Sequence, residues 1–299
     1  MPWTHLLLAL AVVAVWGTNF VVIRYGLDAF EPLAFAALRF AASALPWMLF
    51  IRRPAVRWRT LAAFGVLLGV GQFGLLFLAM RGHITPGLAS LVIQVQVFFT
   101  IGLSMLLHGE RVRTYQIVGL LCAVGGLGLI AGHVDATLSV LGLALVLLAA
   151  FFWACANLVA KSAGRVDMLG FMVWSSAFAA PPLALLSLVF EGPQALWTGV
   201  QHASAAAWAA VAWQALGNTL FGYGAWNWLL SRHPAASVAP LALLVPVFGM
   251  GASAFWLGEP LPPWKLGAAA LVLLGLALII LWPHARARWL RRETLAQAD

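Results

Sequence analysis

The sequence predicts an all-α integral membrane protein with ten transmembrane helices in two inverted five-helix repeats. Three observations lead to this fold class: the composition, the spacing of the charged residues, and a similarity between the two halves of the chain. Of the 299 residues 63% are hydrophobic, mean hydropathy is +0.96, and only 17 Lys and Arg and 9 Asp and Glu are present. A water-soluble protein of this size needs more charge to cover its surface.

The charged residues are gathered in short segments, and the apolar runs between them are long enough to cross a membrane. A helix that rises 1.5 Å per residue needs about 20 residues to span a hydrocarbon core of about 30 Å. Charge, or Pro and Gly, bounds every run. The first five spans are predicted at residues 6–25, 32–51, 61–80, 85–107 and 114–132, and the second five at 138–160, 168–190, 205–230, 235–257 and 264–282.

The basic residues predict the orientation of these spans. With a cytoplasmic N-terminus, 13 Lys and Arg fall in cytoplasmic segments and only Arg24, Arg81 and Lys265 fall on the other side. Positively charged loops stay in the cytoplasm, so both termini are expected there. The net charge of +8 is therefore explained by membrane orientation, and nucleic-acid binding is excluded as the main function.

The two halves of the chain share short patterns. Trp16-Gly-Thr-Asn19 in the first span resembles Trp153-Ala-Cys-Ala-Asn157 in the sixth, and Gly109-Glu110 recurs as Gly258-Glu259 after the ninth. A repeat of five spans places its second copy upside down in the membrane, and inverted repeats are typical of secondary transporters. The domains are expected at residues 1–136 for the first repeat, 137–285 for the second, and 286–299 for a basic cytoplasmic tail.

Four stretches carry a resemblance to a known family. They are GLASLVIQVQVFFT at residues 87–100, GER at 109–111, WACAN at 153–157 and VAPLALLVP at 238–246. In these the chain resembles the EamA-type exporters of the drug/metabolite transporter superfamily, most of all the cysteine and O-acetylserine exporter branch, and is similar to YddG-type amino acid exporters. The resemblance implies a multi-pass protein of the bacterial inner membrane that exports amino acids or related metabolites.

The ionisable residues limit the substrate class. All nine acidic residues lie at span ends, in loops or in the tail, so the embedded carboxylate typical of proton-coupled exporters of cationic drugs is missing. Phosphorylated substrates would need several converging cations, and only Arg39 lies inside a span. Neutral or zwitterionic solutes remain. Arg39 is a candidate for binding a substrate carboxylate, and the alternative is that it holds the helix bundle together.

Polar and aromatic residues at helical spacing form candidate binding faces. Trp16 and Asn19, and Trp153 and Asn157, lie three and four residues apart, so each pair shares one helix face. These repeat-related pairs are expected either to line opposite walls of one cavity or to hydrogen-bond between helices.

Glutamines supply further uncharged polar groups. Gln72 lies in the third span, and Gln94 and Gln96 lie in the fourth. Because residues two apart are about 200° apart around an α-helix, one of Gln94 and Gln96 is expected to face away from the cavity.

The remaining candidates lie in the second repeat. Trp174 and Trp213 lie deep in their spans, and the eighth span also carries Asn218, Tyr223, Trp226 and Asn227, which either line a cavity or pack between helices. Pro240 and Pro246 interrupt the ninth span and predict a hinge or a bend. Glu110 and Glu259 are expected to form structural ion pairs, with Arg111 or Arg113 and with Lys265. The pairs Gly65/Gly69 and Gly128/Gly132 predict close helix packing.

These features favour an alternating-access exporter of neutral amino acids and related metabolites. The alternatives are an exporter of other small metabolites or drugs, and a passive channel. An enzyme is not expected, because the spans hold no zinc-ligand motif, nucleophile pair or paired carboxylates. No cofactor, metal or nucleic-acid partner is predicted, the expected partners are a small-molecule substrate and membrane lipid, and the sequence leaves the oligomeric state open.

Overall fold

The structure, a computed structural model, describes residues 1–108, 113–133, 138–164 and 166–296, with side chains through residue 285 apart from 235, 236 and 284. Every named element in this part of the chain is helical, and the one β-type pairing is an isolated bridge between Ile84 and Leu138. The all-helical prediction is confirmed. The GER turn at 109–111, with Glu110, lies outside the described residues.

The first half of the chain forms five helical passes. Their elements are α1 (Trp3–Leu27), α2 (Pro32–Ala44) with η1 (Trp47–Leu49), α3 (Trp58–Val66) with η2 (Leu67–Gly74) and α4 (Leu75–Met80), α5 (Pro86–Val92) with η3 (Ile93–Val95) and α6 (Gln96–His108), and α7 (Thr114–Ala131).

The second half repeats this order with one added helix. Its elements are α8 (Val140–Ser162), α9 (Met168–Phe190), the extra α10 (Gln194–His202), α11 (Ala205–Ala212) with η4 (Trp213–Phe221) and α12 (Gly222–Arg232), α13 (Ala235–Val238) with η5 (Ala239–Leu244) and α14 (Val245–Leu257), and α15 (Pro263–Ala296). Nine helices of the described chain are long and apolar enough to cross a membrane. Residues 205–232 are helical throughout but are not among these nine, so the count of ten spans stays a prediction.

Two helices in each half depart from α-helical geometry at matching places. The third pass contains the π-helical segment η2 and the eighth contains the π-helical segment η4. The fourth pass contains the 3₁₀ segment η3 and the ninth contains the 3₁₀ segment η5. Such interruptions inside long helices are uncommon and mark functional positions. Their recurrence agrees with a chain built from two structural repeats.

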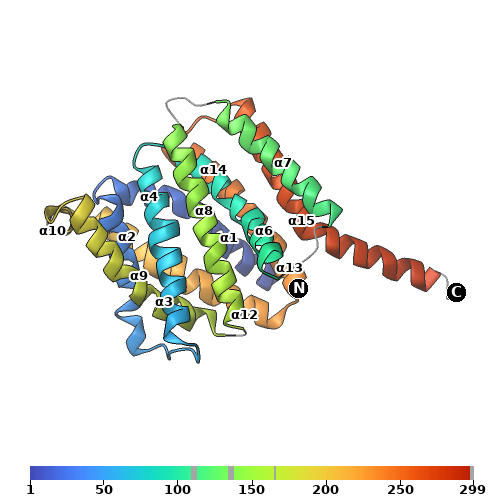
Figure 1. Ribbon diagram of the computed structural model, residues 1–299, viewed down its shortest axis with the longest axis horizontal. Coiled ribbons are helices and arrows are strands. Elements are labelled where there is room, and N and C mark those ends of the chain that lie inside the picture. The colour runs from blue at the N-terminus through green and yellow to red at the C-terminus, as the bar shows by residue number, and fades with distance from the viewer. Residues whose placement is uncertain (109–112, 134–137, 165, 297–299) are drawn as a thin grey trace.

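The helices pack in pairs that relate the two halves. α1 packs along α14, and the equivalent α8 packs along α6; α2 packs against α9, and α7 against α15. Figure 1 shows α7 and α15 side by side at one edge of the bundle, α2, α9 and α10 at the other, and α1, α8 and α14 between them.

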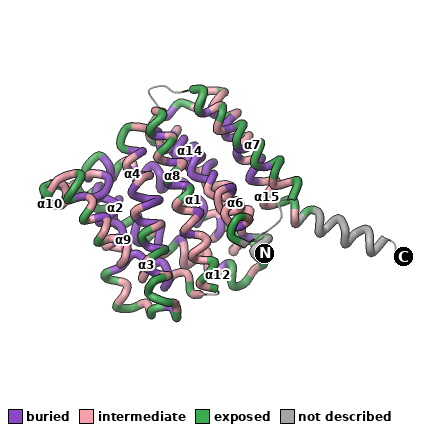
Figure 2. Tube along the Cα trace, viewed as in Figure 1, coloured by how far each residue is buried: buried purple, intermediate pink, exposed green. Residues whose placement is uncertain are grey.

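Burial follows this arrangement. Figure 2 shows buried segments gathered on the central helices and exposed segments along α10 and the outer face of α7. The outer face of α7 is apolar, with Ile117, Val118, Leu120, Leu121 and Val124 all exposed. An exposed apolar surface of this length is expected of a helix that faces lipid.

Glycines allow close helix contacts, as expected for Gly65 and Gly69. A Cβ at Gly65 would lie 2.2 Å from the backbone oxygen of Ser175, and one at Gly69 would lie 2.4 Å from Cβ of Ala179. The prediction for Gly128 and Gly132 is wrong, because neither meets another helix within 4 Å. In α7 the close contacts with α15 are made at Gly119 and Gly126 instead.

Substitutions in α7 test this packing. At Gly119 a Cβ would lie 2.8 Å from the backbone oxygen of Gly275 on α15, whereas at Gly128 it would meet nothing within 4 Å. We expect Gly119→Ala to lower the free energy of unfolding by about 1–3 kcal/mol, the usual cost of overpacking. Gly128→Ala, the matched control in the same helix, should not destabilise the protein. Thermal unfolding in detergent measures both, and equal effects would contradict the assigned helix contact.

Candidate functional site

A cavity of about 460 Å³ lies between the two halves of the chain. Helices of both halves line it, and the π and 3₁₀ segments η2, η3, η4 and η5 all contribute residues. Eight of the residues proposed from the sequence come together here: Trp16, Asn19, Gln72, Gln94, Gln96, Trp153, Asn157 and Tyr223. Among the described residues, those that line the cavity include no Asp, Glu, Lys, Arg or His.

Two cavity asparagines hydrogen-bond between helices as well as lining the cavity. Asn19 on α1 exchanges two bonds with Gln214 on η4, the shorter of them 2.8 Å from Gln214 Nε2 to Asn19 Oδ1. Asn157 on α8 donates from Nδ2 to Gln96 Oε1 at 2.8 Å. The two bonds join the first helix of each repeat to the opposite half. The two roles considered for these asparagines, helix contact and cavity lining, therefore occur together.

Other polar groups of the cavity keep free hydrogen-bonding capacity. The Oε1 atom of Gln72 is buried without a hydrogen-bond partner, and the side chain of Gln94 has none among the described residues. Gln94 and Gln96 both line the cavity, so the expectation that one faces away is wrong. The reason is η3, because three residues per turn bring positions two apart closer to one side than an α-helix does.

Three proposed site residues lie outside the cavity. Arg39 is buried on α2, behind the cavity-lining ring of Phe73. Trp174 donates from Nε1 to the backbone oxygen of Ile51 at 3.0 Å, which ties α9 to the segment after η1. Trp213 is 37% exposed on the surface of the bundle, where it faces away from the cavity.

The eighth pass contributes more to the cavity than the sequence alone could assign. Asn218, Trp226 and Asn227 line it together with Tyr223. The Nε1 atom of Trp16 donates to the backbone oxygen of Asn218 at 3.2 Å, which places an indole against η4. The signal for these residues was their polarity within an otherwise apolar stretch, but it did not distinguish cavity lining from helix packing.

The cavity reaches one end of the bundle. We call this end the terminal face, because α1 begins there and the segments 50–57, 161–164, 166–167 and 231–234 lie there (Figure 1). Ala160, Met168 and Leu230, at the ends of α8, α9 and α12 on this face, all line the cavity.

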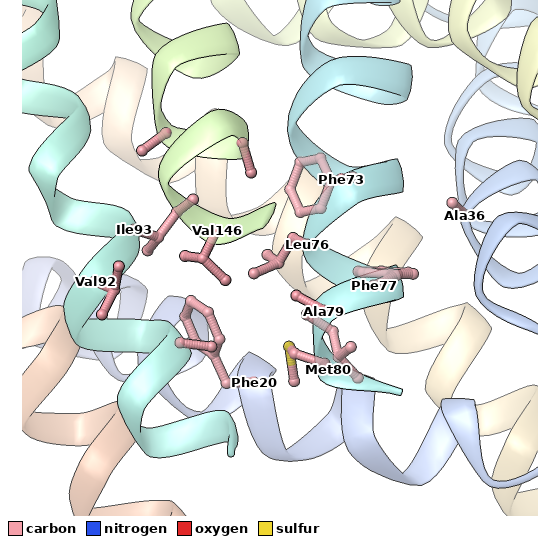
Figure 3. Packing of buried hydrophobic residues seen from close by; sticks show 14 of the residues in the cluster. Phe20, Ala36, Phe73, Leu76, Phe77, Ala79, Met80, Val92, Ile93 and Val146 are labelled. Atoms are coloured by element: carbon pink, nitrogen blue, oxygen red, sulfur yellow. The ribbon is translucent and has the colours of Figure 1, made fainter. Parts of the chain in front are cut away.

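A cluster of packed apolar residues, the apolar plug, lies on the side of the cavity toward the opposite end of the bundle, the distal face. Figure 3 shows Phe20, Leu76, Met80 and Val146 converging from α1, α4 and α8, with Ile93 of η3 beside them. All five side chains are buried. Packed apolar residues therefore lie on the distal side of the cavity, and the residues that line it extend to helix ends at the terminal face.

Carboxylates link separate helices on the distal face. Glu259 accepts from the backbone nitrogen of Gly87 at 2.9 Å and pairs with Lys265 at 2.9 Å. The pairing of Glu259 with Lys265 expected from the sequence is confirmed. Glu191 accepts from the backbone nitrogen of Leu33 at 2.6 Å, which caps the first turn of α2 from the end of α9.

Arg81 adds a third link on the distal face. Its Nη2 atom lies 2.8 Å from Glu31 Oε1, and its Nη1 atom donates to the backbone oxygen of Leu27, so the end of α4 is tied to the turn between α1 and α2.

The two prolines of the ninth pass lie at its break. Pro240 falls in the 3₁₀ segment η5, and Pro246 occupies the first turn of α14. The matching break in the fourth pass, η3, contains no proline. A proline is therefore not needed for the interruption, and the hinge role of Pro240 and Pro246 stays a prediction.

Comparison with known proteins agrees with this architecture. The sequence profile of the EamA-like transporter family matches residues 3–132 and again residues 140–281. The chain belongs to the EamA-like transporter family. This EamA-like chain is a multi-pass membrane transporter, and its two matched regions correspond to the two halves described above.

Relatives support the assignment, and a solved structure shares the fold. The chain is 38% identical to a "Probable amino-acid metabolite efflux pump" of Escherichia coli K12 and to one of the same description in Salmonella typhimurium, each over 90% of this chain and 92% of the relative. It is 29% identical to a "Probable terminal-alkyne amino-acid exporter" of Streptantibioticus cattleyicolor, over 89% and 90% of the two chains. A crystal structure at 17% identity shares the fold, with a TM-score of 0.63 over 94% of this chain and 98% of the other.

Proposed function

We propose that this transporter exports neutral amino acids and related metabolites, with cysteine and O-acetylserine foremost, by alternating access. The observation that supports this most is the uncharged cavity, whose polar groups are amides, indoles and one phenol. Amides offer both donors and acceptors to an ammonium and a carboxylate, so a zwitterion can bind without a net charge on the wall. The volume lies within the range of small-molecule sites. Relatives described as amino-acid efflux pumps and exporters support the same substrate class.

The direction of transport is inferred from the access to the cavity. If the terminal face is cytoplasmic, the cavity is open to the cytoplasm and closed by the apolar plug toward the outside. This is the state in which an exporter accepts its substrate. The matching interruptions η2 and η4, and η3 and η5, are places where each repeat could bend to close one side and open the other.

Export by cells tests the proposal. Cells that produce the protein should accumulate cysteine and O-acetylserine in the medium to a higher level than cells with an empty vector, and they should resist higher external concentrations of cysteine. The variant Gly71→Trp serves as a control that should not export. Its side chain would overlap Phe152 of α8, so the contact between η2 and α8 cannot form. Equal external amino acid levels for protein and empty vector would contradict the proposed substrate class.

The orientation of the chain is a separate prediction. Reporter fusions after Asp299 and within the segment 191–204 should report opposite sides, with the C-terminus in the cytoplasm, because most basic residues lie on the terminal side. A C-terminus outside the cell would contradict the inverted-repeat account and reverse the inferred direction of transport.

A further inference from the structure

A buried cation lies directly behind the cavity wall. The side chain of Arg39 is 1% exposed, and its Nε and Nη1 atoms have no hydrogen-bond partner. Its guanidinium lies 3.8 Å from the ring centroid of Phe73 and 4.6 Å from that of Phe40. Burial of a charged donor without a partner costs several kcal/mol by order of magnitude. Cation-π contacts with the two rings offset part of this cost but supply no hydrogen-bond acceptor.

The neighbouring helices supply no anion to this guanidinium. The described residues form no ion pair with Arg39. The carboxylates that flank the start of α2 are engaged elsewhere, Glu31 with Arg81 and Glu191 with the first turn of α2 itself. An anion that pairs with Arg39 must therefore come from outside the described chain.

One residue that contacts Arg39 also lines the cavity. It is Phe73, whose ring covers the guanidinium. A single aromatic side chain therefore separates the unpaired cation from the substrate space. Phe73 belongs to the π-helical segment η2, where the backbone hydrogen bonding is irregular.

An unpaired acceptor lies beside this wall. Gln72, which precedes Phe73, lines the cavity, and its buried Oε1 atom has no hydrogen-bond partner. The unpaired donors of Arg39 and the unpaired acceptor of Gln72 are complementary to the two ends of an α-amino acid. A guanidinium donates charge-assisted hydrogen bonds to a carboxylate, and an amide oxygen accepts from an ammonium.

We propose that Arg39 is the carboxylate-binding residue of this transporter and that rotation of the Phe73 ring gives the cavity access to it. This inference rests on the proposed function and narrows it: the site selects solutes with a free carboxylate over the same solutes with that group blocked. Phe73 acts as a cover that keeps the cation out of the empty cavity, and a bound carboxylate compensates the cost of its burial.

Ligand-dependent thermal stability of the purified protein tests the proposal. The probes are cysteine, alanine and phenylalanine, each compared with its carboxamide, which keeps the ammonium and the side chain but lacks the carboxylate. The variant is Arg39→Gln, and the matched control is Arg24→Gln, which removes an exposed arginine paired with Asp28 on α1.

Wild type and the Arg24→Gln control should be stabilised by at least one acid at concentrations at least ten-fold lower than by its amide. In Arg39→Gln this preference should disappear through weaker binding of the acid, because a charge-assisted bond contributes about 1.5–3 kcal/mol, at least a ten-fold change in affinity. A preference retained in Arg39→Gln, or absent from wild type, would overturn the proposal.

A second variant covers the case in which Arg39→Gln does not fold. Phe73→Leu removes the ring that covers the guanidinium, so it should strengthen binding of the acids relative to their amides, and an unchanged ratio would count against the proposal. Transport separates this inference from the proposed function. If acids bind through Arg39 but no amino acid is transported, the proposed function fails; if amino acids are transported and Arg39→Gln keeps the acid preference, only this inference fails.

Discussion

Replacement of Lys265 with methionine is expected to destabilise the protein by about 3–5 kcal/mol, the cost of leaving one partner of a buried ion pair alone. The side chains of Lys265 and Glu259 are 1% and 4% exposed, and Glu259 also caps the start of α5. Without Lys265 the carboxylate stays buried with hydrogen bonds from Gly87 and Thr85 but no cation. Thermal unfolding in detergent and the amount of inserted protein measure the loss.

The double variant Glu259→Gln/Lys265→Met is the control for this prediction. It removes both charges, so it should recover a large part of the stability lost in Lys265→Met. Glu259→Gln alone should lower stability or abundance without selectively removing any proton dependence of transport. A fully abundant Glu259→Gln protein that had lost proton coupling would show that this residue acts in coupling and not only in the distal contacts.

Removal of a free amide from the cavity should lower transport without unfolding the protein. The side chain of Gln94 lines the cavity and forms no hydrogen bond with the described residues, so Gln94→Leu removes no hydrogen bond from the fold. A hydrogen bond to a charged group contributes about 1.5–3 kcal/mol, so we expect the substrate flux per inserted molecule to fall about ten-fold or more. Flux in proteoliposomes measures the expected loss of transport, and thermal unfolding checks that the stability is unchanged.

Asn157→Leu provides the contrast. Asn157 both lines the cavity and donates to Gln96, so its loss should lower flux and also stability, whereas Gln94→Leu should lower flux alone. Unchanged flux in Gln94→Leu, Asn157→Leu and a Trp16 variant together would show that these residues only hold helices together and that the pathway lies elsewhere.

The helices could be predicted from the sequence because the thickness of the membrane sets the length of each apolar run. The apolar run 168–190 coincides with α9, and the runs at 32–51 and 114–132 begin where α2 and α7 begin. Interruptions inside the helices could not be predicted in the same way. Pro240 indicates the break at η5, but η2 and η3 contain no proline, so no residue that removes a backbone donor marks them in the sequence.

The sequence predicts which types of residue line the site better than it predicts which way each of them faces. Repeat symmetry and polarity placed Asn19 and Asn157 together on the cavity wall, but hydropathy does not tell which side of a helix meets a partner. Trp213 and Gln214 are adjacent in η4, yet the indole faces outward while the amide bonds to Asn19. Arg39 was recognisable as an intramembrane cation, and only the packed structure shows that the ring of Phe73 covers it.

Counterflow of labelled amino acids in proteoliposomes tests the central claim most directly, since it asks whether the purified protein alone moves these solutes through a saturable site. Vesicles loaded with unlabelled cysteine or O-acetylserine should take up the labelled compound transiently above equilibrium, with saturation and with stimulation by internal substrate. Alternating access by an amino acid exporter predicts this result. Flux that neither saturates nor responds to internal substrate would indicate a passive channel, and no flux of any amino acid in a neutral panel would contradict the proposed substrate class.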